Sequence, residues 1–377
     1  MKNLNYNNIT IKTFAGLEGL VAKEIKLLGA ENVVELKRAV TCTADKALVY
    51  KMNLHLRTGL KVLIDIHKFR VDSAQRLYKK VQEINWSEIL TPQMTFAIDS
   101  TVNKAPAFDS TNFVSLKAKD AIVDQIRNKH QIRPSVDSEN PDLRIHVHIS
   151  GEDCDISLDS SGMSLHRRGY RISGGGAPLN EALAAGMIML TGWSGEKDFI
   201  NPMCGSGTML IEAAMIAGNI APGINRKFGF MRWRDFDKEL WREIFKEALA
   251  SKKEIECKII GSDISAESVD LAILNIDRCR LTDDIIISRR DFFESKPMGK
   301  PAIIIINPPY NLRLEIDNID QIYKQIGDTL KNKFNQSEAW IISGNQNAIK
   351  QVGLKYTQKI KLFNGPLECT YRQYELY

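Results

Sequence analysis

The sequence predicts an α/β protein in which an α+β, ferredoxin-like unit comes first and a doubly wound, Rossmann-like parallel sheet comes last. Three observations predict this fold class. Strand and helix patterns follow the order β-α-β-β-α-β over the first 70 residues. They alternate again after residue 178, and a continuous apolar strand stands at 302–306. A length of 377 residues suits two or three domains of this kind.

The first 70 residues carry the ferredoxin-like order. We expect strands at residues 9–13, 32–36, 39–43 and 61–69, and helices at 17–28 and 45–57. The first helix is indicated by apolar residues at helical spacing followed by Gly29, which ends it. The order β-α-β-β-α-β is typical of a ferredoxin-like unit, a small fold that hosts many functions.

A second unit is expected at residues 71–160. It contains a predicted helix at 114–129 and a strand at 143–149, in which apolar residues alternate with Arg144, His146 and His148. Two histidines two residues apart could ligate a metal, but no third ligand is near in sequence. We therefore expect no metal and a polar sheet face, which could meet phosphates.

The segment 161–177 is polar and rich in glycine, and it contains the run His-Arg-Arg-Gly-Tyr-Arg at 166–171. This composition predicts a linker between domains. Its basic side chains are expected either to be solvated or to touch RNA.

The last part, residues 178–377, predicts the parallel sheet. We expect helices at 180–191 and 266–280, and strands at 198–200, 257–261, 285–287 and 302–306. The strand at 302–306 is apolar throughout, as in a strand that is buried on both faces. In a sheet of this type, ligands bind beyond the carboxyl ends of the strands.

Three loops follow such strand ends. The first, at 201–208, has Gly205 and Gly207, which allow close backbone approach to a ligand, but it matches neither a dinucleotide fingerprint nor a phosphate-binding P-loop. In the second, Asp263 could accept hydrogen bonds from ribose hydroxyls or cap the following helix. In the third, Asp291 could face an adenine or cap a turn.

The Asn-Pro-Pro-Tyr turn at 307–310 is the most specific feature. Two prolines hold the turn rigid and leave the amide oxygen of Asn307 and the carbonyl of Pro308 as fixed acceptors. Two acceptors that bind the hydrogens of an exocyclic amino group can align its nitrogen lone pair for attack. Tyr310 could stack on a base turned out of its helix, which is worth about 1–3 kcal/mol.

These motifs resemble those of the THUMP-containing RNA guanine-N2 methyltransferases, and among them the amino-terminal half of the bifunctional enzymes of large-subunit ribosomal RNA. The matching segments span nearly the whole chain: 84–86, 117–124, 141–144, 168–171, 177–181, 201–214, 307–310 and 364–369. The resemblance implies a class I methyltransferase domain that uses S-adenosylmethionine, preceded by a THUMP domain and a ferredoxin-like domain.

The resemblance also implies a reaction and a set of site residues. The reaction would be methylation of a guanine N2 in 23S ribosomal RNA or a large-subunit assembly intermediate. The catalytic residues would be Asn307, Pro308 and Tyr310. The cofactor would be bound by Asn201, Pro202, Cys204, Gly205, Ser206, Gly207, Thr208, Asp263, Asp291 and Asn307.

Two positions depart from the family pattern. Asn201 stands where the family loop usually begins with Asp, so an acceptor is kept but the charge that would attract the ammonium group of the cofactor is lost. Asn311 follows Tyr310 where the family often has Gly. The first departure keeps open a non-catalytic RNA-binding or ribosome-assembly role. Two enzymatic alternatives are a transfer-RNA guanine-N2 methyltransferase and an adenine-N6 DNA enzyme.

Composition narrows the classes further. No apolar run is long enough for a membrane span, and no signal peptide is evident, so we expect a cytoplasmic protein without a membrane partner. The six cysteines form no Cys-x-x-Cys pair, which argues against a zinc site. The net charge is +5; residues 1–170 hold 24 Lys and Arg against 20 Asp and Glu, and the remainder 27 against 26. This excess permits RNA binding by the front half without requiring it.

Overall fold

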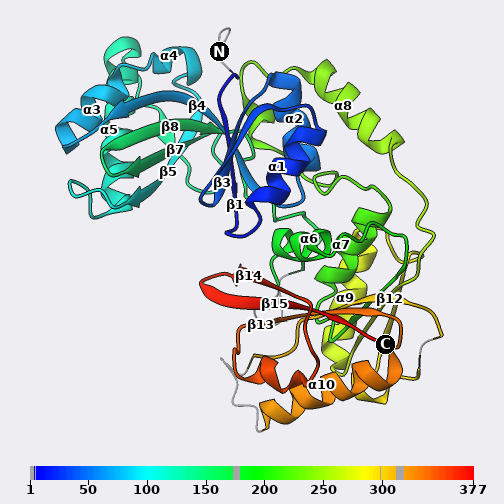
Figure 1. Ribbon diagram of the computed structural model, residues 1–377. Helices are drawn as coiled ribbons and strands as arrows, with labels where there is room; N and C mark the ends of the chain where they lie inside the picture. Colours follow the sequence, from blue (N-terminus) through cyan, green and yellow to red (C-terminus); the bar gives the residue numbers. More distant parts are fainter. Residues whose placement is uncertain (1–3, 5, 173–178, 298, 311–317) are drawn as a thin grey trace. The chain divides into compact units, whose positions relative to one another are not determined.

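The structure, a computed structural model, describes residues 4, 6–172, 179–297, 299–310 and 318–377. The chain forms two compact units, which we call unit 1 and unit 2 (Figure 1). Unit 1 contains residues 1–13, 21–165 and 226–245, and unit 2 contains residues 14–20, 166–225 and 246–377. Each unit therefore includes a short segment whose sequence neighbours belong to the other unit.

Unit 1 is built on one eight-stranded sheet with the order β2-β3-β1-β4-β8-β7-β5-β6. Its strands are β1 Ile9–Thr13, β2 Glu31–Leu36, β3 Ala39–Thr43, β4 Gly59–Arg70, β5 Thr95–Asn103, β6 Ser135–Val136, β7 Leu143–Ser150 and β8 Asp153–Asp159. Its helices are α1 Glu18–Leu27, of which the first turn belongs to unit 2, α2 Lys46–His55, α3 Ala74–Gln82, α4 Trp86–Ile89 and α5 Thr111–His130. The order β1-α1-β2-β3-α2-β4 confirms the predicted ferredoxin-like order. Strand β4 pairs with β1 on one side and β8 on the other, so the ferredoxin-like strands and the strands that follow share a single sheet.

One face of this sheet is polar. The registers between β1, β4, β8, β7 and β5 place alternate polar residues side by side, including His146 and His148. His146 is buried, its Nε2 lies 3.1 Å from the Thr101 hydroxyl, and burial lowers its pKa to about 3. His146 is thus a buried imidazole on this face, and a contact between the polar face and phosphates stays a prediction. Among the described residues no group of three or more potential metal ligands occurs.

The segment 226–245 packs within unit 1. It holds the 3-10 turn η1 Gly229–Arg232 and the start of helix α8 Lys238–Ala250. Phe230 stacks on Tyr50 of α2 with ring centroids 4.2 Å apart, and Trp241 meets both rings edge-on. Trp233 is also buried. Both tryptophans therefore contribute to the packing of unit 1.

Unit 2 is built on a seven-stranded sheet with the order β11-β10-β9-β12-β13-β15-β14. Its strands are β9 Asp198–Pro202, β10 Ile259–Asp263, β11 Ile285–Arg289, β12 Ala302–Ile306, β13 Glu338–Ser343, β14 Gln358–Asn364 and β15 Leu367–Glu375. Its helical elements are α6 Glu181–Leu190, α7 Thr208–Ala217, α9 Ala266–Arg278, η2 Phe292–Glu294, α10 Ile319–Lys333 and η3 Ala348–Val352. The predicted parallel sheet is confirmed for β9 to β13, but β15 runs antiparallel to both β13 and β14. The hairpin of β14 and β15 was not predicted, although Asn364 and Gly365 at the turn between these strands are a typical hairpin signal.

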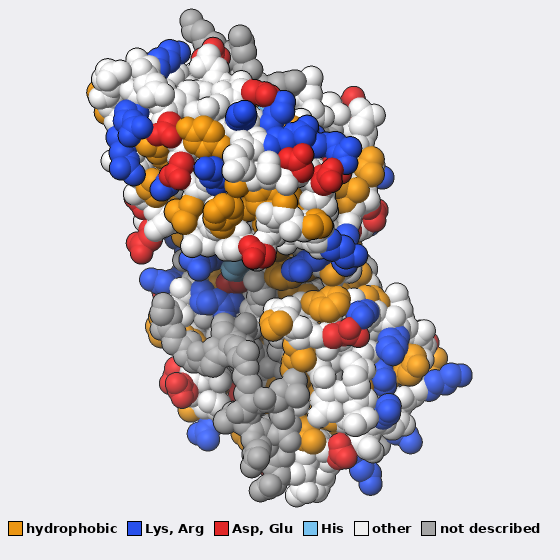
Figure 2. Space-filling view, turned by 90° about the vertical axis from the view of Figure 1, so that its left-hand side faces the viewer, with side chains coloured by type: hydrophobic (Ala, Val, Ile, Leu, Met, Phe, Trp, Pro, Cys, Tyr) orange, Lys and Arg blue, Asp and Glu red, His pale blue; other side chains and the backbone are white. Residues whose placement is uncertain are grey.

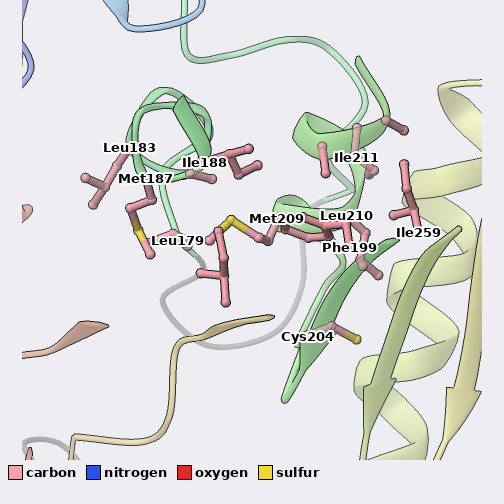
Figure 3. Packing of buried hydrophobic residues seen from close by; sticks show 14 of the residues in the cluster. Leu179, Leu183, Met187, Ile188, Phe199, Cys204, Met209, Leu210, Ile211 and Ile259 are labelled. Atoms are coloured by element: carbon pink, nitrogen blue, oxygen red, sulfur yellow. The ribbon is translucent and has the colours of Figure 1, made fainter. Parts of the chain in front are cut away.

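Two apolar cores cover the two faces of this sheet. Strand β12 contributes Ile303 and Ile305 to one core and Ile304 and Ile306 to the other, which explains its uninterrupted apolar sequence. The first core contains Leu183 and Met187 of α6 together with Met209 and Leu210 of α7 (Figure 3). Leu17, from the 14–20 segment, is fully buried in the same core. Unit 2 is thus completed by residues from the front of the chain.

The described part of the expected linker is buried in part. Arg168 is buried and forms an ion pair with Glu212 of α7, with Nε 3.2 Å from Oε1, and Tyr170 donates to the same carboxylate at 3.3 Å. The expectation that the basic side chains of this segment face solvent or RNA is therefore wrong for Arg168, whereas Arg167 is exposed. A buried guanidinium and a buried carboxylate compensate one another, a relation between positions 168 and 212 that local composition does not reveal. Residues 173–177 lie outside the described residues.

Within the described parts of the chain, no helix has both the length and the apolar character needed to cross a membrane.

Candidate functional site

A pocket of about 560 Å³ lies at the carboxyl ends of β9, β10, β11 and β12 in unit 2. The strand order places β10 on one side of β9 and β12 on the other, so the order of the strands reverses between β9 and β12. Such a switch point is where ligands bind in open α/β sheets. The predicted residues that line the pocket are Asn201, Cys204, Gly205, Ser206, Thr208, Asp263, Asp291 and Asn307. The predicted residues that do not line it are Pro202, Gly207, Pro308 and Tyr310.

The loop after β9 turns sharply into helix α7. Gly205 and Gly207 both have positive φ, +53° and +79°, and Gly207 is the residue that caps the start of the helix. A β-carbon at Gly207 would lie 3.0 Å from the Ala272 side chain, whereas one at Gly205 would meet no described atom within 4 Å. Gly207 is therefore required by packing against α9, while Gly205 leaves open space beside the pocket.

Asp263, the last residue of β10, ties that strand to the glycine loop. Its Oδ2 accepts from the Gly205 amide at 2.9 Å, and its Oδ1 accepts from the Ser265 amide at 3.0 Å. The residue that caps helix α9 is Ser265, which accepts from the Ser268 amide. The suggestion that Asp263 itself caps this helix is therefore wrong. Its carboxylate remains at the pocket wall with unused lone pairs.

Asp291 follows β11 and caps the turn η2 by accepting from the Phe293 amide at 2.9 Å. The turn-capping interpretation of this residue is confirmed. Phe292 and Phe293, which come next, also line the pocket and give it an apolar wall on this side. A contact between Asp291 and an adenine stays a prediction.

Asn201 is 2% exposed and links β9 to β12. Its side-chain Nδ2 donates to the carbonyl of Ile305 at 2.7 Å. Its Oδ1 is buried and has no hydrogen-bond partner among the described residues. A buried acceptor without a donor is costly, so the pocket wall holds a group that gains from a ligand N–H.

The turn at 307–310 is held from three directions. The Tyr310 hydroxyl donates to Asn307 Oδ1, the Tyr323 hydroxyl donates to the Pro309 carbonyl at 3.3 Å, and Asn345 Nδ2 donates to the Tyr310 carbonyl at 3.4 Å. Burial raises the pKa of the Tyr310 hydroxyl well above its usual value. The acceptor expected to be free at Asn307 is thus engaged by Tyr310, which does not line the pocket. The following residue, Asn311, lies outside the described residues.

An arginine network that the sequence did not reveal supports the same loop. Arg171 Nη2 donates to the hydroxyl of Thr208 at 3.1 Å and to the carbonyl of Leu179 at 2.9 Å, and both of these residues line the pocket. Its Nε donates to Glu181 at 2.8 Å. Only the resemblance over residues 168–171 could have pointed to this role.

Further pocket residues were missed. They are Leu179, Met203, Met209, Ile264, Ser268, Leu271, Arg290, Phe292, Phe293, Pro309 and Ile322. Most of them adjoin a strand end that the sequence did mark, so widening each predicted loop by a few residues would have found them. Ile322 comes from α10, which is distant in sequence and carries no local signal.

Comparison with protein families gives three matches that follow one another along the chain. The model of the RMKL-like methyltransferase domain matches residues 168–373. The model of the THUMP domain matches residues 71–159, and that of the RlmL ferredoxin-like domain matches residues 8–63.

Individual relatives agree with these matches. A Synechocystis protein named provisionally as an RNA methyltransferase is 39% identical over 96% of this chain and 95% of its own length. The ribosomal RNA large subunit methyltransferase K/L of Methylococcus capsulatus is 37% identical over 94% of this chain, which spans about half, 49%, of that enzyme. A solved structure of a protein described provisionally as a methyltransferase, complexed with SAH, has a TM-score of 0.89 with 27% identity and 98% of both chains covered.

Proposed function

Since this chain belongs to the RMKL-like methyltransferase family and carries THUMP and RlmL ferredoxin-like domains, we propose that it is an RNA methyltransferase acting on the N2 amino group of a guanine in 23S ribosomal RNA. One observation carries the proposal. A single pocket at the switch point of the sheet is lined by the glycine loop after β9, by Asp263 and Asp291, and by Asn307 of the Asn-Pro-Pro-Tyr turn. The loop proposed to bind the cofactor and the proposed acceptor of the amino group line the same cavity.

The cofactor proposed for this pocket is S-adenosylmethionine, which supplies an electrophilic methyl group. The described residues fit it. The unpartnered Oδ1 of Asn201 can accept from an ammonium group, and the open space beside Gly205 admits a ligand next to the start of α7. Asp263 would accept from ribose hydroxyls, and Phe292 and Phe293 would lie against the adenine. The SAH found with a structural relative supports this assignment.

The amino group of the substrate would be bound by the turn after β12. The Asn307 amide oxygen and the Pro308 carbonyl would accept its two hydrogens and so align the nitrogen lone pair with the methyl group. For this, the Tyr310 hydroxyl has to give up its present hydrogen bond to Asn307. The proton leaves the guanine amine for solvent after attack has made it acidic, so no strong general base is required. Orientation of this kind can supply about 7–11 kcal/mol.

RNA would be held by unit 1, which contains the ferredoxin-like and THUMP parts. Lys and Arg side chains are interspersed with Asp and Glu on the face of unit 1 seen in Figure 2. Such a surface suits phosphate contacts at separate points and recognition by RNA shape. We place the protein in the cytoplasm, where ribosomal RNA is assembled into subunits. The choice of 23S RNA rests on the large-subunit enzymes that this chain matches over about half their length.

The test of this function is transfer of a tritiated methyl group to separate RNA and DNA substrates. We expect incorporation into large-subunit ribosomal RNA or its assembly intermediates, with N2-methylguanine as the product. Incorporation into transfer RNA alone would replace the substrate, and incorporation into DNA alone would contradict the proposal. No incorporation together with no cofactor binding at millimolar concentration would favour a non-catalytic RNA-binding role.

The variant Asn307→Ala tests the assignment within the site. It should bind cofactor as the wild type does, while methylation falls at least 100-fold because an aligned hydrogen bond to the reacting group is lost. The control is Asn347→Ala, an exposed asparagine at the start of η3 that lies outside the pocket lining, and it should keep full activity. Full activity of Asn307→Ala would contradict the assigned role.

A further inference from the structure

Helix α9 has four buried residues, of which three are apolar and the fourth is Asn275. Asn275 is 1% exposed and lies one turn after Ala272, on the same face of the helix. This face packs against the glycine loop after β9, since a β-carbon at Gly207 would lie 3.0 Å from the Ala272 side chain. Burial of an amide costs free energy unless its donor and its acceptor are both hydrogen-bonded.

Both ends of this amide are bound to the backbone of other segments. Asn275 Nδ2 donates to the carbonyl of Ser206 at 2.9 Å, and Oδ1 accepts from the amide of Ile172 at 3.0 Å. A carbonyl can only accept and a backbone N–H can only donate, so these two partners fix which end of the side chain faces which segment. One asparagine therefore joins the glycine loop to the segment 168–172.

The bond to Ser206 fixes a peptide group beside the proposed cofactor site. The carbonyl of the peptide between Ser206 and Gly207 is bound by Asn275, and its N–H donates to the Cys204 carbonyl at 3.0 Å. Cys204 and Ser206 line the pocket, whereas Asn275 does not. Without the amide, the Ser206 carbonyl would lack this donor, and rotation of the peptide toward another donor would move the neighbouring pocket residues.

The bond to Ile172 reaches the same loop by a second route. Ile172 follows Arg171, whose Nη2 donates to the Thr208 hydroxyl at 3.1 Å. Thr208 is the first residue of α7 and lines the pocket. Asn275 thus holds the backbone next to Arg171, and Arg171 holds the residue that follows Gly207.

We propose that Asn275 is a positioning residue of the cofactor site, and that its amide fixes the conformation of the glycine loop by joining Ser206 to Ile172. The inference rests on the proposed function, in which this loop binds S-adenosylmethionine. Asn275 acts through the loop, because it does not line the pocket. Its loss therefore weakens cofactor binding, while the reaction of the bound cofactor, which depends on the turn at 307–310, is largely kept.

The decisive variants are Asn275→Leu and Asn275→Asp, studied in the full chain. Leucine removes both hydrogen bonds without burying a charge, whereas aspartate keeps an acceptor for Ile172 and loses the donor to Ser206. In both variants we expect S-adenosylhomocysteine, titrated by calorimetry, to bind about 10-fold more weakly, the size of effect associated with a lost buried hydrogen bond. The KM for S-adenosylmethionine should rise by a similar factor, while kcat at saturating cofactor stays within about three-fold of the wild type. Amide hydrogen exchange in a peptide covering residues 204–210 should become faster.

The matched control is Asn53→Asp. Asn53 is also 1% exposed, and its side chain is hydrogen-bonded to the hydroxyls of Ser160 at 2.8 Å and Ser161 at 2.7 Å, all within unit 1. Its free energy of unfolding should fall as much as that of Asn275→Asp, because both variants place a carboxylate at an equally buried position. Cofactor affinity, KM and exchange in residues 204–210 should nevertheless equal those of the wild type.

Three outcomes overturn the inference. The first is wild-type affinity and wild-type exchange in Asn275→Leu, which alone decides if the aspartate variant fails to fold. The second is an equal loss of affinity in Asn53→Asp, which would make the effect one of stability. The third is wild-type affinity in Asn275→Asp, which would show that the bond to Ser206 has no part in the effect.

Failure of the proposed function gives a different result. In that case the wild type would bind S-adenosylhomocysteine but methylate no RNA. Weaker binding by Asn275→Leu would then still support the positioning role, and equal binding would contradict it. A wild type that binds no S-adenosylhomocysteine would overturn both proposals.

Discussion

The sheets of the two units carry their polar side chains in different places. In unit 1, polar residues cover one face of the sheet, and opposite charges meet across the strands: Lys61 Nζ lies 2.8 Å from Asp159 and 3.2 Å from Asp99, and Arg144 lies 3.1 Å from Asp99. In unit 2, apolar cores cover both faces of the sheet. Its polar groups gather at the carboxyl edge, where Asn201 Oδ1 has no hydrogen-bond partner in the described part of the chain.

This difference distinguishes polar groups that stabilise the fold from polar groups that are available to bind a ligand. Paired charges on a face are compensated within the protein, so their loss is expected to change stability. Polar groups at a strand edge that enclose a cavity are compensated only in part, so their loss is expected to change binding or rate. The two regions therefore predict opposite readouts for substitutions of similar chemistry.

The largest expected effect is that of Lys61→Met on the free energy of unfolding. Asp159 has no exposed side-chain area, and removal of Lys61 leaves its buried carboxylate without its cation. We expect a loss of about 2–4 kcal/mol in denaturant unfolding, with the affinity for S-adenosylhomocysteine unchanged. The control, Arg70→Met, removes the exposed ion pair to Glu152 at the other end of β4 and should cost less than about 1 kcal/mol.

The same variant should change the dependence of stability on pH. Burial raises the pKa of the Asp159 carboxyl, and the charge of Lys61 opposes that rise. Because the pKa of Asp159 is higher in the folded state, this carboxyl loses its proton at lower pH in the unfolded chain than in the folded protein. The free energy of unfolding therefore decreases as the pH rises above about 4. Without Lys61 the folded pKa is higher, and the fall should be steeper and extend to higher pH. If the free energy of unfolding depended on pH in the same way in the wild type and in Lys61→Met, Lys61 would not compensate the charge of Asp159.

Asp263→Asn tests the edge of unit 2, where the expected change is in binding. The substitution keeps one oxygen acceptor but loses the charge and one of the two acceptors that now bind the Gly205 and Ser265 amides. We expect about 10-fold weaker binding of S-adenosylhomocysteine by calorimetry and a stability within about 1 kcal/mol of the wild type. Asp270→Asn, an exposed change on helix α9, is the control. Equal affinity in all three proteins would remove Asp263 from the binding site.

The sequence predicted the parts of the molecule that depend on local pattern. Strands β1, β3 and β12 have the predicted bounds, because each is a short apolar or alternating run between clear turn signals. The residues that follow the strands of unit 2 meet in one pocket because parallel strands bring their carboxyl ends to one edge. The family resemblance was carried by the same residues.

Other features depend on contacts between distant positions and left no local signal. The burial of Arg168 requires Glu212, and the packing of Leu17 within unit 2 requires Gly186, where a β-carbon would lie 2.7 Å from the leucine. Likewise, a proline-rich turn gave no reason to expect that Tyr310 donates to Asn307. The periodicity of apolar residues predicts which face of a helix or strand is buried, but it does not predict which other element packs against that face.

The smallest expected effect is that of Tyr310→Phe. This variant tests whether polar groups at the carboxyl edge of the unit 2 sheet await a ligand, unlike the paired charges on the face of the unit 1 sheet. The Tyr310 hydroxyl donates to Asn307 Oδ1, while the Tyr310 ring is the proposed stacking surface for the base. Tyr310→Phe keeps the ring and frees the acceptor that the substrate needs. We therefore expect kcat within about three-fold of the wild type, since the lost bond is replaced by one to the substrate.

Tyr310→Ala removes the ring as well and should lower kcat/KM for RNA about 10- to 100-fold, the range expected for loss of base stacking. Cofactor affinity should not change in either variant, because Tyr310 does not line the pocket. If Tyr310→Phe lost as much activity as Tyr310→Ala, the hydroxyl itself would be needed during catalysis. The hydrogen bond from Tyr310 to Asn307 would then be needed for the reaction. These two side chains would be a compensated polar pair at the carboxyl edge of unit 2, like the ion pairs on the sheet face of unit 1.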